Sequence, residues 1–237
     1  MVPAPPLSAE MTAAEACARL EADGWRQVGA GDWSWVFADP DDVRAVRVTP
    51  FDPGYRMFAE ACLAGPANRW LPRMAGILPL VRDGYAVVME RLWPADEAAA
   101  SALCAALGIA NETNHPPPKP GPAVAMDAPD LAALRARTLA LLTDVRTRFG
   151  RWAACDIREG NVMADRDGAL KLVDPVGVGG WMIAAALREG RADPLADFSV
   201  AQLLDFLTIP YFCPGREGLE EKDALASIVA RLSLTAP

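Results

Sequence analysis

Histidine and lysine are nearly absent from this 237-residue chain. A single histidine, His115, is too few for a histidine-based catalytic triad or a histidine metal cluster, which excludes several enzyme classes. Of the 23 basic residues, only Lys119, Lys171 and Lys222 are lysines, and the others are arginines. A chain with this preference can carry arginine at a position where other proteins use lysine.

Paired cysteines are missing as well. The five cysteines are scattered, odd in number and form no C-x-x-C motif; they are Cys17, Cys62, Cys104, Cys155 and Cys213. We therefore expect neither a zinc site nor a disulfide framework, and the natural compartment is the reducing cytoplasm.

Long apolar runs are also absent. No stretch approaches the roughly 18 apolar residues of a membrane-spanning helix. The segment Met1–Pro6 lacks the basic and apolar regions of a signal peptide. The net charge of −8 repels nucleic acid and anionic lipid. We expect neither a membrane nor a nucleic acid as a partner, so a phosphate-binding site would be a local exception.

What the chain does have is a change from strands to helices near residue 90. The capping-box spacing of Thr12 and Glu15 predicts a helix over residues 8–22. Turn residues bound short apolar stretches, which predict strands over residues 25–28, 33–38, 43–48, 77–81 and 85–89, with a helix over 55–64.

Beyond Met89 the pattern is mainly helical. We expect helices over residues 95–110, 130–149 and 181–189 and a hairpin from 161–164 and 169–173. The second helix is amphipathic, with an apolar face of Leu131, Leu134, Leu139, Leu142 and Val145. With 52% apolar and 23% charged residues, the composition fits a globular protein with a proper core.

Two glycines one residue apart mark a turn between two predicted strands. Gly29 and Gly31 lie in the sequence VGAGDWSWVF, residues 28–37, which also contains Ser34. Glycine permits a tight reversal whose backbone N–H groups approach phosphate oxygens. A plain hairpin with a glycine turn is the alternative.

The second chemical signal lies in the sequences DIREGNVM, residues 156–163, and LKLVDPVG, residues 170–177. Asp156 and Asn161 flank one loop, and the predicted hairpin can return Asp174 beside it. Asn161 and Asp174 can then hold Mg²⁺ as oxygen ligands, which leaves Asp156 to accept a proton from a hydroxyl. The alternative is that the two aspartates merely cap or end local structure.

These motifs resemble the protein-kinase-like superfamily, which includes protein kinases and the related aminoglycoside and choline kinases. The resemblance spans residues 24 to 178. It implies a single α+β domain with a bilobal kinase-like fold. A small antiparallel-sheet lobe with one helix would occupy residues 20–91 and a hinge 92–94. A mainly helical lobe would occupy 95–237 and include a proline-rich connection at 111–129.

The resemblance also implies roles for individual residues in ATP binding. Gly29, Gly31 and Ser34 would cover the phosphates. Arg47 would hold them where kinases use lysine, and Glu60 would orient Arg47. Each of these two also has a simpler interpretation, as an exposed basic residue and a solvated helix glutamate.

Further roles follow for the rest of the motif. The backbone from Glu90 to Leu92 would bind adenine, and Arg158 would steady the moving phosphoryl group unless it is a surface arginine. Asp197 would either brace the catalytic loop or cap a helix.

Three positions depart from the kinase pattern. Arg47 replaces a lysine, and its guanidinium is wider and planar. Cys155 precedes Asp156 where kinases carry arginine, which argues against control by a phosphorylated activation loop. Pro175 follows Asp174 in place of an aromatic residue, which favours the small-molecule branch.

Three functions therefore stay open. The first is an ATP- and Mg²⁺-dependent phosphotransferase acting on a hydroxyl of a protein or a small molecule. The second is a pseudokinase that binds nucleotide or serves as a scaffold without turnover, which Arg47 favours. The third is an interaction protein that binds no nucleotide.

Overall fold

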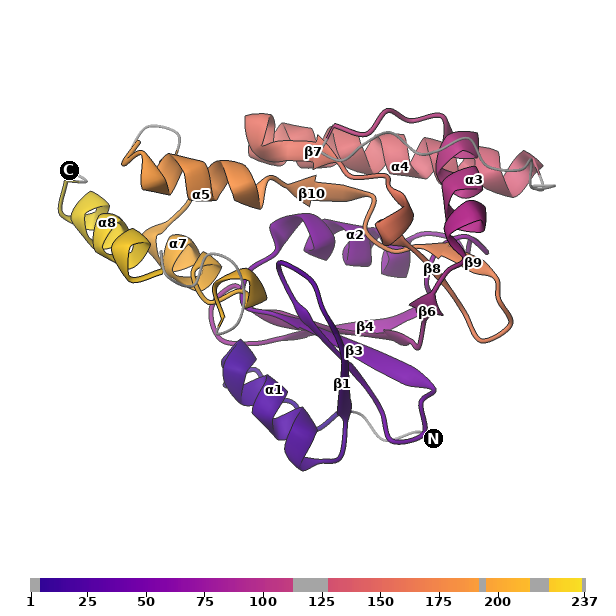
Figure 1. Cartoon of the computed structure of the whole chain (residues 1–237), viewed down its shortest axis with the longest axis horizontal. Coiled ribbons are helices and arrows are strands. Elements are labelled where there is room, and N and C mark those ends of the chain that lie inside the picture. The colour runs from indigo at the N-terminus through magenta and orange to yellow at the C-terminus, as the bar shows by residue number, and fades with distance from the viewer. Residues whose placement is uncertain (1–4, 113–127, 192–194, 214–221, 236–237) are drawn as a thin grey trace. The chain divides into compact units, whose positions relative to one another are not determined.

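The computed structural model describes residues 5–112, 128–191, 195–213 and 222–235 (Figure 1). Residues 113–127, which include His115 and most of the predicted connection 111–129, lie outside the described residues. Helices and an antiparallel sheet make up the fold, which confirms the predicted α+β class. Within the described part of the chain, no helix combines the length and the apolar character needed to cross a membrane.

The helices and strands follow the predicted order closely. The helices are α1 (Ala13–Ala22), α2 (Pro53–Ala64), α3 (Glu97–Leu107), α4 (Ala128–Phe149), α5 (Gly180–Arg188), α7 (Val200–Phe206) and α8 (Lys222–Thr235), with short 3₁₀ turns η1 (Gly150–Trp152), η2 (Glu159–Asn161) and η3 (Pro210–Phe212). The strands are β1 (Arg26–Ala30), β2 (Trp35–Ala38), β3 (Arg44–Thr49), β4 (Met74–Pro79), β5 (Tyr85–Glu90), β6 (Trp93–Pro94), β7 (Ala153–Cys155), β8 (Val162–Ala164), β9 (Leu170–Leu172) and β10 (Val176–Val178).

Contacts divide the chain into two compact units. Unit 1 comprises Met1–Asp52, Ile77–Val88 and Gly179–Pro237, and unit 2 comprises Pro53–Gly76 and Met89–Val178. This division does not confirm the predicted lobes at 20–91 and 95–237, because the last part of the chain groups with the first. The lobe boundaries stay a prediction.

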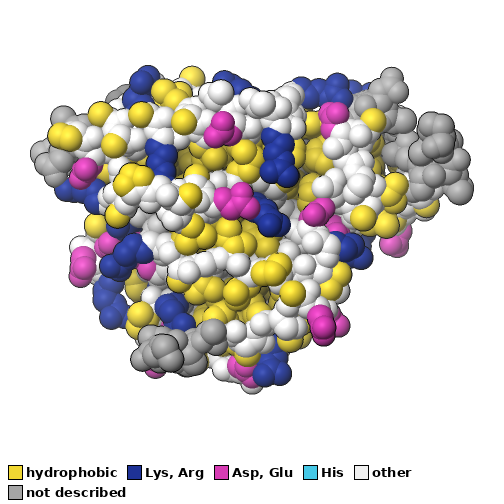
Figure 2. Space-filling model, turned by 180° about the vertical axis from the view of Figure 1, so that it is seen from behind, with side chains coloured by type: hydrophobic (Ala, Val, Ile, Leu, Met, Phe, Trp, Pro, Cys, Tyr) yellow, Lys and Arg dark blue, Asp and Glu magenta, His cyan; other side chains and the backbone are white. Residues whose placement is uncertain are grey.

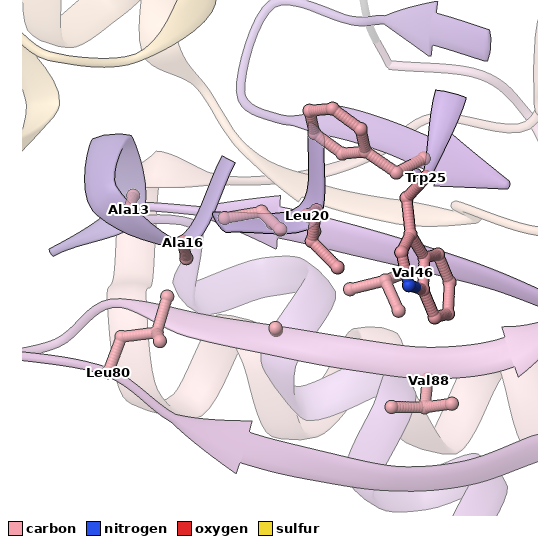
Figure 3. Close-up of a cluster of buried hydrophobic side chains, with 10 residues drawn as sticks. Ala13, Ala16, Leu20, Trp25, Val46, Leu80 and Val88 are labelled. Atoms are coloured by element: carbon pink, nitrogen blue, oxygen red, sulfur yellow. The ribbon is translucent and has the colours of Figure 1, made fainter. Parts of the chain in front are cut away.

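A five-stranded sheet with the order β1-β2-β3-β5-β4 organises unit 1. β1 pairs antiparallel with β2, and β2 pairs antiparallel with β3, as the three successive predicted strands require. Helix α1 packs on this sheet, where Ala16 and Leu20 meet Val46 and Val88 in a buried apolar cluster (Figure 3). Burial of such side chains stabilises a fold by about 1.5–3 kcal/mol each.

Helix α1 begins later than predicted. Thr12 is its N-cap: the Thr12 side chain accepts a hydrogen bond from the Glu15 N–H, and the Glu15 carboxylate accepts one from the Thr12 N–H at 2.8 Å. The predicted capping box is therefore confirmed. The predicted start at residue 8 is wrong, because an N-cap residue ends the helix on its N-terminal side.

Unit 2 contains α2, α3 and α4, a β10-β7 pair and a three-stranded sheet with the order β6-β8-β9. The sequence analysis missed β6, β7 and β10, since runs of two or three residues give no periodic signal. It also misjudged the apolar face of α4. Leu139 is 36% exposed, whereas Leu141 is buried beside Leu142, because the buried stripe follows the steps of 3.6 residues from Leu134.

Charges of both signs are mixed over the visible surface. In Figure 2, which shows the molecule from behind, the basic and acidic side chains are interspersed, with apolar side chains between them. All five cysteines are described, and none of them forms a disulfide bond.

Asp39 closes the turn between β2 and β3 with a buried carboxylate. It accepts hydrogen bonds from the N–H groups of Val43 at 2.7 Å and Arg44 at 3.1 Å, and from Arg44 Nε at 2.9 Å. Burial raises the pKa of Asp39, but these hydrogen bonds and the Arg44 charge outweigh burial, so the pKa lies below its ordinary value. The charged form of Asp39 therefore stabilises the folded state.

We expect Asp39→Asn to lower the free energy of unfolding by about 1.5–3 kcal/mol at pH 7, because hydrogen bonds to a charged acceptor contribute that much. A lowered folded pKa stabilises the protein above the unfolded pKa, and the effect is lost as pH falls through the folded value. Urea unfolding should therefore show a smaller difference between variant and wild type at pH 3. Asp41→Asn, at an exposed position of the same turn, is the control. An equal loss at both pH values would contradict the assignment.

Candidate functional site

Two short strands of unit 2 bring together Asp156, the predicted catalytic residue, and Asp174, a predicted metal ligand. β7 pairs antiparallel with β10, with Cys155 opposite Val176. Asp156 directly follows β7, and its N–H donates to the carbonyl of Pro175 at 2.9 Å. Because Asp174 precedes Pro175, this pairing returns Asp174 to the loop that carries Asp156.

The side chain of Asn161 connects the two aspartates. Its Nδ2 atom donates to the Asp156 carbonyl at 2.7 Å, to Asp156 Oδ2 at 2.8 Å and to the Asp174 carbonyl at 2.8 Å. The backbone carbonyl of Asn161 in turn accepts a hydrogen bond from the N–H of Val173 at 2.9 Å. Asn161 is only 6% exposed, so these bonds are shielded from water. The structure thus brings Asp156, Asn161 and Asp174 together.

The chemistry of this donor set fits a magnesium ion. Because Nδ2 of Asn161 faces the two aspartates, the Oδ1 atom remains as its acceptor. Mg²⁺ binds such amide oxygens and carboxylates and retains several waters. In the described parts of the chain, no three His, Cys, Asp or Glu side chains gather to hold a metal. Magnesium binding by Asn161 and Asp174 stays a prediction.

Arg158 lies against the proposed base. Its Nε atom is 3.1 Å from Oδ1 and 3.3 Å from Oδ2 of Asp156, and its side chain is 33% exposed. An added Cβ on Gly160 would lie 2.8 Å from the Arg158 guanidinium, so a glycine at this position leaves room for it. The contact with Asp156 agrees both with a surface arginine paired to that carboxylate and with a residue that steadies the phosphoryl group, so the role of Arg158 in catalysis stays a prediction.

Glu112 is bonded to β7, the strand that leads into Asp156. Glu112 was not among the predicted site residues. The Glu112 N–H donates to the Cys155 carbonyl at 3.0 Å, and the Cys155 N–H donates to Glu112 Oε2 at 3.2 Å. A hydrogen bond from Arg146 holds the pKa of Glu112 below its ordinary value. Burial raises the pKa of Cys155 to about 11, which favours the protonated thiol.

The predicted glycine turn is present in unit 1. β1 and β2 form the hairpin, with a bulge between Gln27 and Gly29, and the N–H of Gly31 donates to the Ser34 carbonyl at 3.0 Å. Ser34 is buried, whereas an added Cβ on Gly31 would meet no atom within 4 Å. This geometry fits a plain hairpin and a phosphate-binding turn equally, so phosphate contact stays a prediction.

Arg47 is largely buried rather than exposed. Its Nη2 atom lies 2.9 Å from Oδ2 of Asp52, and the side chains are 11% and 6% exposed. The alternative of an exposed basic residue is therefore wrong. Removing one partner of a buried pair typically costs about 3–5 kcal/mol, so Asp52 is a structural partner that the sequence analysis missed.

Glu60 forms an ion pair within its own helix. Its Oε1 atom is 3.0 Å from Nε of Arg56, one turn earlier on α2, and both side chains are about half exposed. This geometry agrees with the alternative of a solvated helix glutamate. Arg47 belongs to unit 1 and Glu60 to unit 2, and an Arg47–Glu60 pair stays a prediction.

The predicted adenine-binding segment connects β5 with β6. Glu90 exchanges backbone and side-chain hydrogen bonds with Arg73: its N–H donates to the Arg73 carbonyl at 2.9 Å, and its carboxylate accepts from Arg73 Nε at 2.7 Å. Leu92 is 4% exposed, and its carbonyl accepts a hydrogen bond from Arg91. These bonds fix the course of the segment, while adenine binding stays a prediction.

Lys171 is a buried lysine whose importance the sequence analysis missed. Its Nζ atom is 2.7 Å from the Arg69 carbonyl, 3.4 Å from Asp165 Oδ2 and 4.0 Å from Glu90 Oε1. It therefore connects β9, which leads into Asp174, with the segment at Glu90. The signal available in the sequence was a rare lysine between two leucines, in a strand otherwise apolar.

Asp197 is not the N-cap of α7, and its proposed bracing of the catalytic loop stays a prediction. Helix α7 begins at Val200 with Ser199 as its N-cap, and Ser199 forms a capping box with Gln202. The alternative of Asp197 as an N-cap is therefore wrong for α7, since Ser199 and Gln202 have the three-residue spacing that a capping box requires.

Comparisons with known proteins give only remote likenesses. No protein-family model matches the chain, and no curated protein matches it. Among solved structures, the chain is similar to the aminoglycoside phosphotransferase APH(4)-Ia, with 13% identity over 95% of this chain and 99% of that one and a TM-score of 0.33.

Two further matches are thermostable mutants of the same enzyme. One is a ternary complex with AMP-PNP and hygromycin B (12% identity, 88% of this chain, 92% of that one, TM-score 0.30). The other is a complex with ADP and hygromycin B (15% identity, 91% and 95%, TM-score 0.31). So remote a likeness assigns this chain neither a substrate nor an activity.

We expect Lys171→Met to lower the free energy of unfolding by about 3 kcal/mol, because it leaves two carboxylates near a buried position without their ammonium partner. Urea unfolding at neutral pH measures the loss. Lys222→Met, at the start of α8, removes a lysine outside this network and should change stability by less than about 0.5 kcal/mol. Similar losses in both variants would show that Lys171 is not a structural partner of Glu90 and Asp165.

Proposed function

We propose that this chain is an ATP- and Mg²⁺-dependent phosphotransferase that moves the γ-phosphoryl group of ATP to a hydroxyl of a protein or a small molecule. One observation carries the proposal. The buried Asn161 side chain binds the carboxylate of Asp156 and the backbone of both aspartates at 2.7–2.8 Å. Capping or local turn formation by the two aspartates would not require this connection.

Asp156 is the proposed general base. Its carboxylate accepts hydrogen bonds from Asn161 and Arg158, so its orientation is fixed before any acceptor arrives. The acceptor hydroxyl gives its proton to Asp156 while its oxygen forms a bond to the γ-phosphorus, and the bond from that phosphorus to ADP breaks. General-base catalysis of this kind contributes about 10²–10⁴-fold in rate.

Other residues handle the charge of the phosphoryl group. Arg158 supplies a guanidinium beside the base, which can stabilise negative charge that develops on the phosphoryl oxygens. Asn161 and Asp174 are the proposed ligands of Mg²⁺, which when bound neutralises phosphate charge. Asp156 is proposed to orient the acceptor hydroxyl and to accept its proton.

The proposed nucleotide contacts come from two further segments. Gly29, Gly31 and Ser34 are proposed to cover the phosphates, and Arg47 to hold them with Glu60 as its orienting partner. The backbone from Glu90 to Leu92 is proposed to bind adenine. The five cysteines favour a reducing cytoplasm as the compartment.

The catalytic test is the rate of γ-phosphate release from Mg-ATP. We expect Asp156→Asn to lower this rate by about 10²–10⁴-fold, because an amide cannot accept the proton. The variant should still show a rise in melting temperature with AMP-PNP. Asp167→Asn, in the exposed turn between β8 and β9, is the matched control and should keep the wild-type rate. An Asp156→Asn protein as active as wild type would overturn the proposed role.

A nucleotide-binding pseudokinase is the second candidate, and the Arg47–Asp52 pair favours it. A buried carboxylate 2.9 Å from Arg47 competes with phosphate for the guanidinium. For this function we expect AMP-PNP to raise the melting temperature of wild type, while wild type and Asp156→Asn release equally little phosphate. Absence of a thermal shift with any nucleotide, with Mg²⁺ or without, would instead favour an interaction protein that binds none.

A further inference from the structure

The glycine turn of unit 1 is held in place by the C-terminal part of the same unit. We call the segment from Phe198 to Phe212 the C-terminal brace; it contains α7 and η3. The N–H of Tyr211, in the brace, donates to the carbonyl of Asp32, in the turn, at 3.1 Å. A backbone bond of this kind fixes the turn directly rather than through side chains.

An aromatic contact adds to this bond. The ring of Trp33, also in the turn, lies 5.4 Å from the ring of Phe206 and 6.1 Å from that of Phe51. Phe51 in turn meets Phe198 edge to face at 6.0 Å. Such pairs contribute beyond the area that they bury. Phe206 and Phe51 are almost fully buried, so Trp33 packs against side chains of the apolar core.

The turn is also fixed from the side of the sheet. Thr49, at the end of β3, donates its hydroxyl to the Trp33 carbonyl at 2.7 Å. The Thr49 hydroxyl oxygen accepts from the N–H of Phe51 at 3.2 Å. The carbonyls of Asp32 and Trp33 are therefore both engaged, one by the brace and one by the sheet.

Two further features hold the C-terminal part against the sheet. The buried carboxylate of Asp205 pairs with the guanidinium of Arg82, whose Nε atom lies 2.9 Å from Oδ2. At the start of α5, an added Cβ on Gly180 would lie 2.6 Å from the ring of Trp33. Glycine at position 180 thus permits the close approach of α5 to the turn.

We propose that the C-terminal brace sets the conformation of the glycine turn in advance, which makes Trp33 and Phe206 positioning residues for nucleotide binding. This inference rests on the proposed function. A turn whose carbonyls and tryptophan are already fixed needs little further ordering when phosphate oxygens meet its N–H groups. Preorganisation of this kind raises affinity because less conformational freedom is lost on binding.

The test compares variants of the full chain by two measurements. Hydrogen exchange reports the mobility of the peptide that covers residues 28–36, and calorimetry gives the Kd of AMP-PNP with Mg²⁺. We expect Phe206→Ala to speed exchange in that peptide and to raise the Kd about fivefold or more. Phe206→Leu, a milder change that keeps the fold if alanine does not, should shift both quantities in the same direction by less.

Leu20→Ala is the matched control. Leu20 is buried in the cluster between α1 and the sheet, so its truncation destabilises unit 1 without touching the brace. We expect it to leave the Kd of AMP-PNP unchanged below its melting temperature. A double variant with Trp33→Ala and Phe206→Ala should raise the Kd by less than the product of the single effects, since both act through one contact.

Each outcome decides the proposal. An unchanged Kd in Phe206→Ala, or a tighter one, would overturn it, as would equal effects in Phe206→Ala and Leu20→Ala. Wild-type protein that binds no AMP-PNP would overturn the proposed function and the effect on affinity together. The exchange measurement would then show separately whether the brace holds the turn.

Discussion

The hydrogen bonds of the buried Asn161 side chain fix the arrangement on which the proposed chemistry of unit 2 depends. The Nδ2 group of Asn161 is shared among Asp156 and the backbone that leads into Asp174, so a loop and a strand end are fixed to each other at one atom. In an interior shielded from water, an amide left without these partners would be costly. The same bonds fix the Asp156 carboxylate and turn the amide oxygen away from it. The stability of this loop and its proposed chemistry therefore both depend on the side chain of Asn161.

Much of this arrangement could be predicted from the sequence. Turn residues marked the strands of unit 1, and the capping-box spacing of Thr12 and Glu15 marked α1, because these signals are local. The spacing of Asp156, Asn161 and Asp174 predicted that these residues lie close together, because the hairpin β8–β9 returns the chain over a short distance. Turn residues, the capping box of α1 and the return of the hairpin β8–β9 were thus predicted correctly from local patterns.

Tertiary partners could not be predicted, because nothing in a local pattern identifies them. Asp52 binds Arg47, Glu112 binds the strand before Asp156, and Lys171 binds the carbonyl of Arg69, which lies far away in sequence. The face of α4 was misjudged at Leu139 for a different reason, since the buried stripe follows steps of 3.6 residues from Leu134 and includes Leu141 instead. Burial of charged residues, in particular, is a property of the whole fold.

The grouping of the chain's two ends in unit 1 has a consequence for how the protein is made. During synthesis on the ribosome, Trp33 and Phe51 emerge long before Phe198 and Phe206, against which they pack. The aromatic surface of the nascent sheet therefore stays uncovered until Phe198 and Phe206 have been synthesised. Contacts so far apart in sequence slow folding and extend the time in which chaperones can bind the nascent chain.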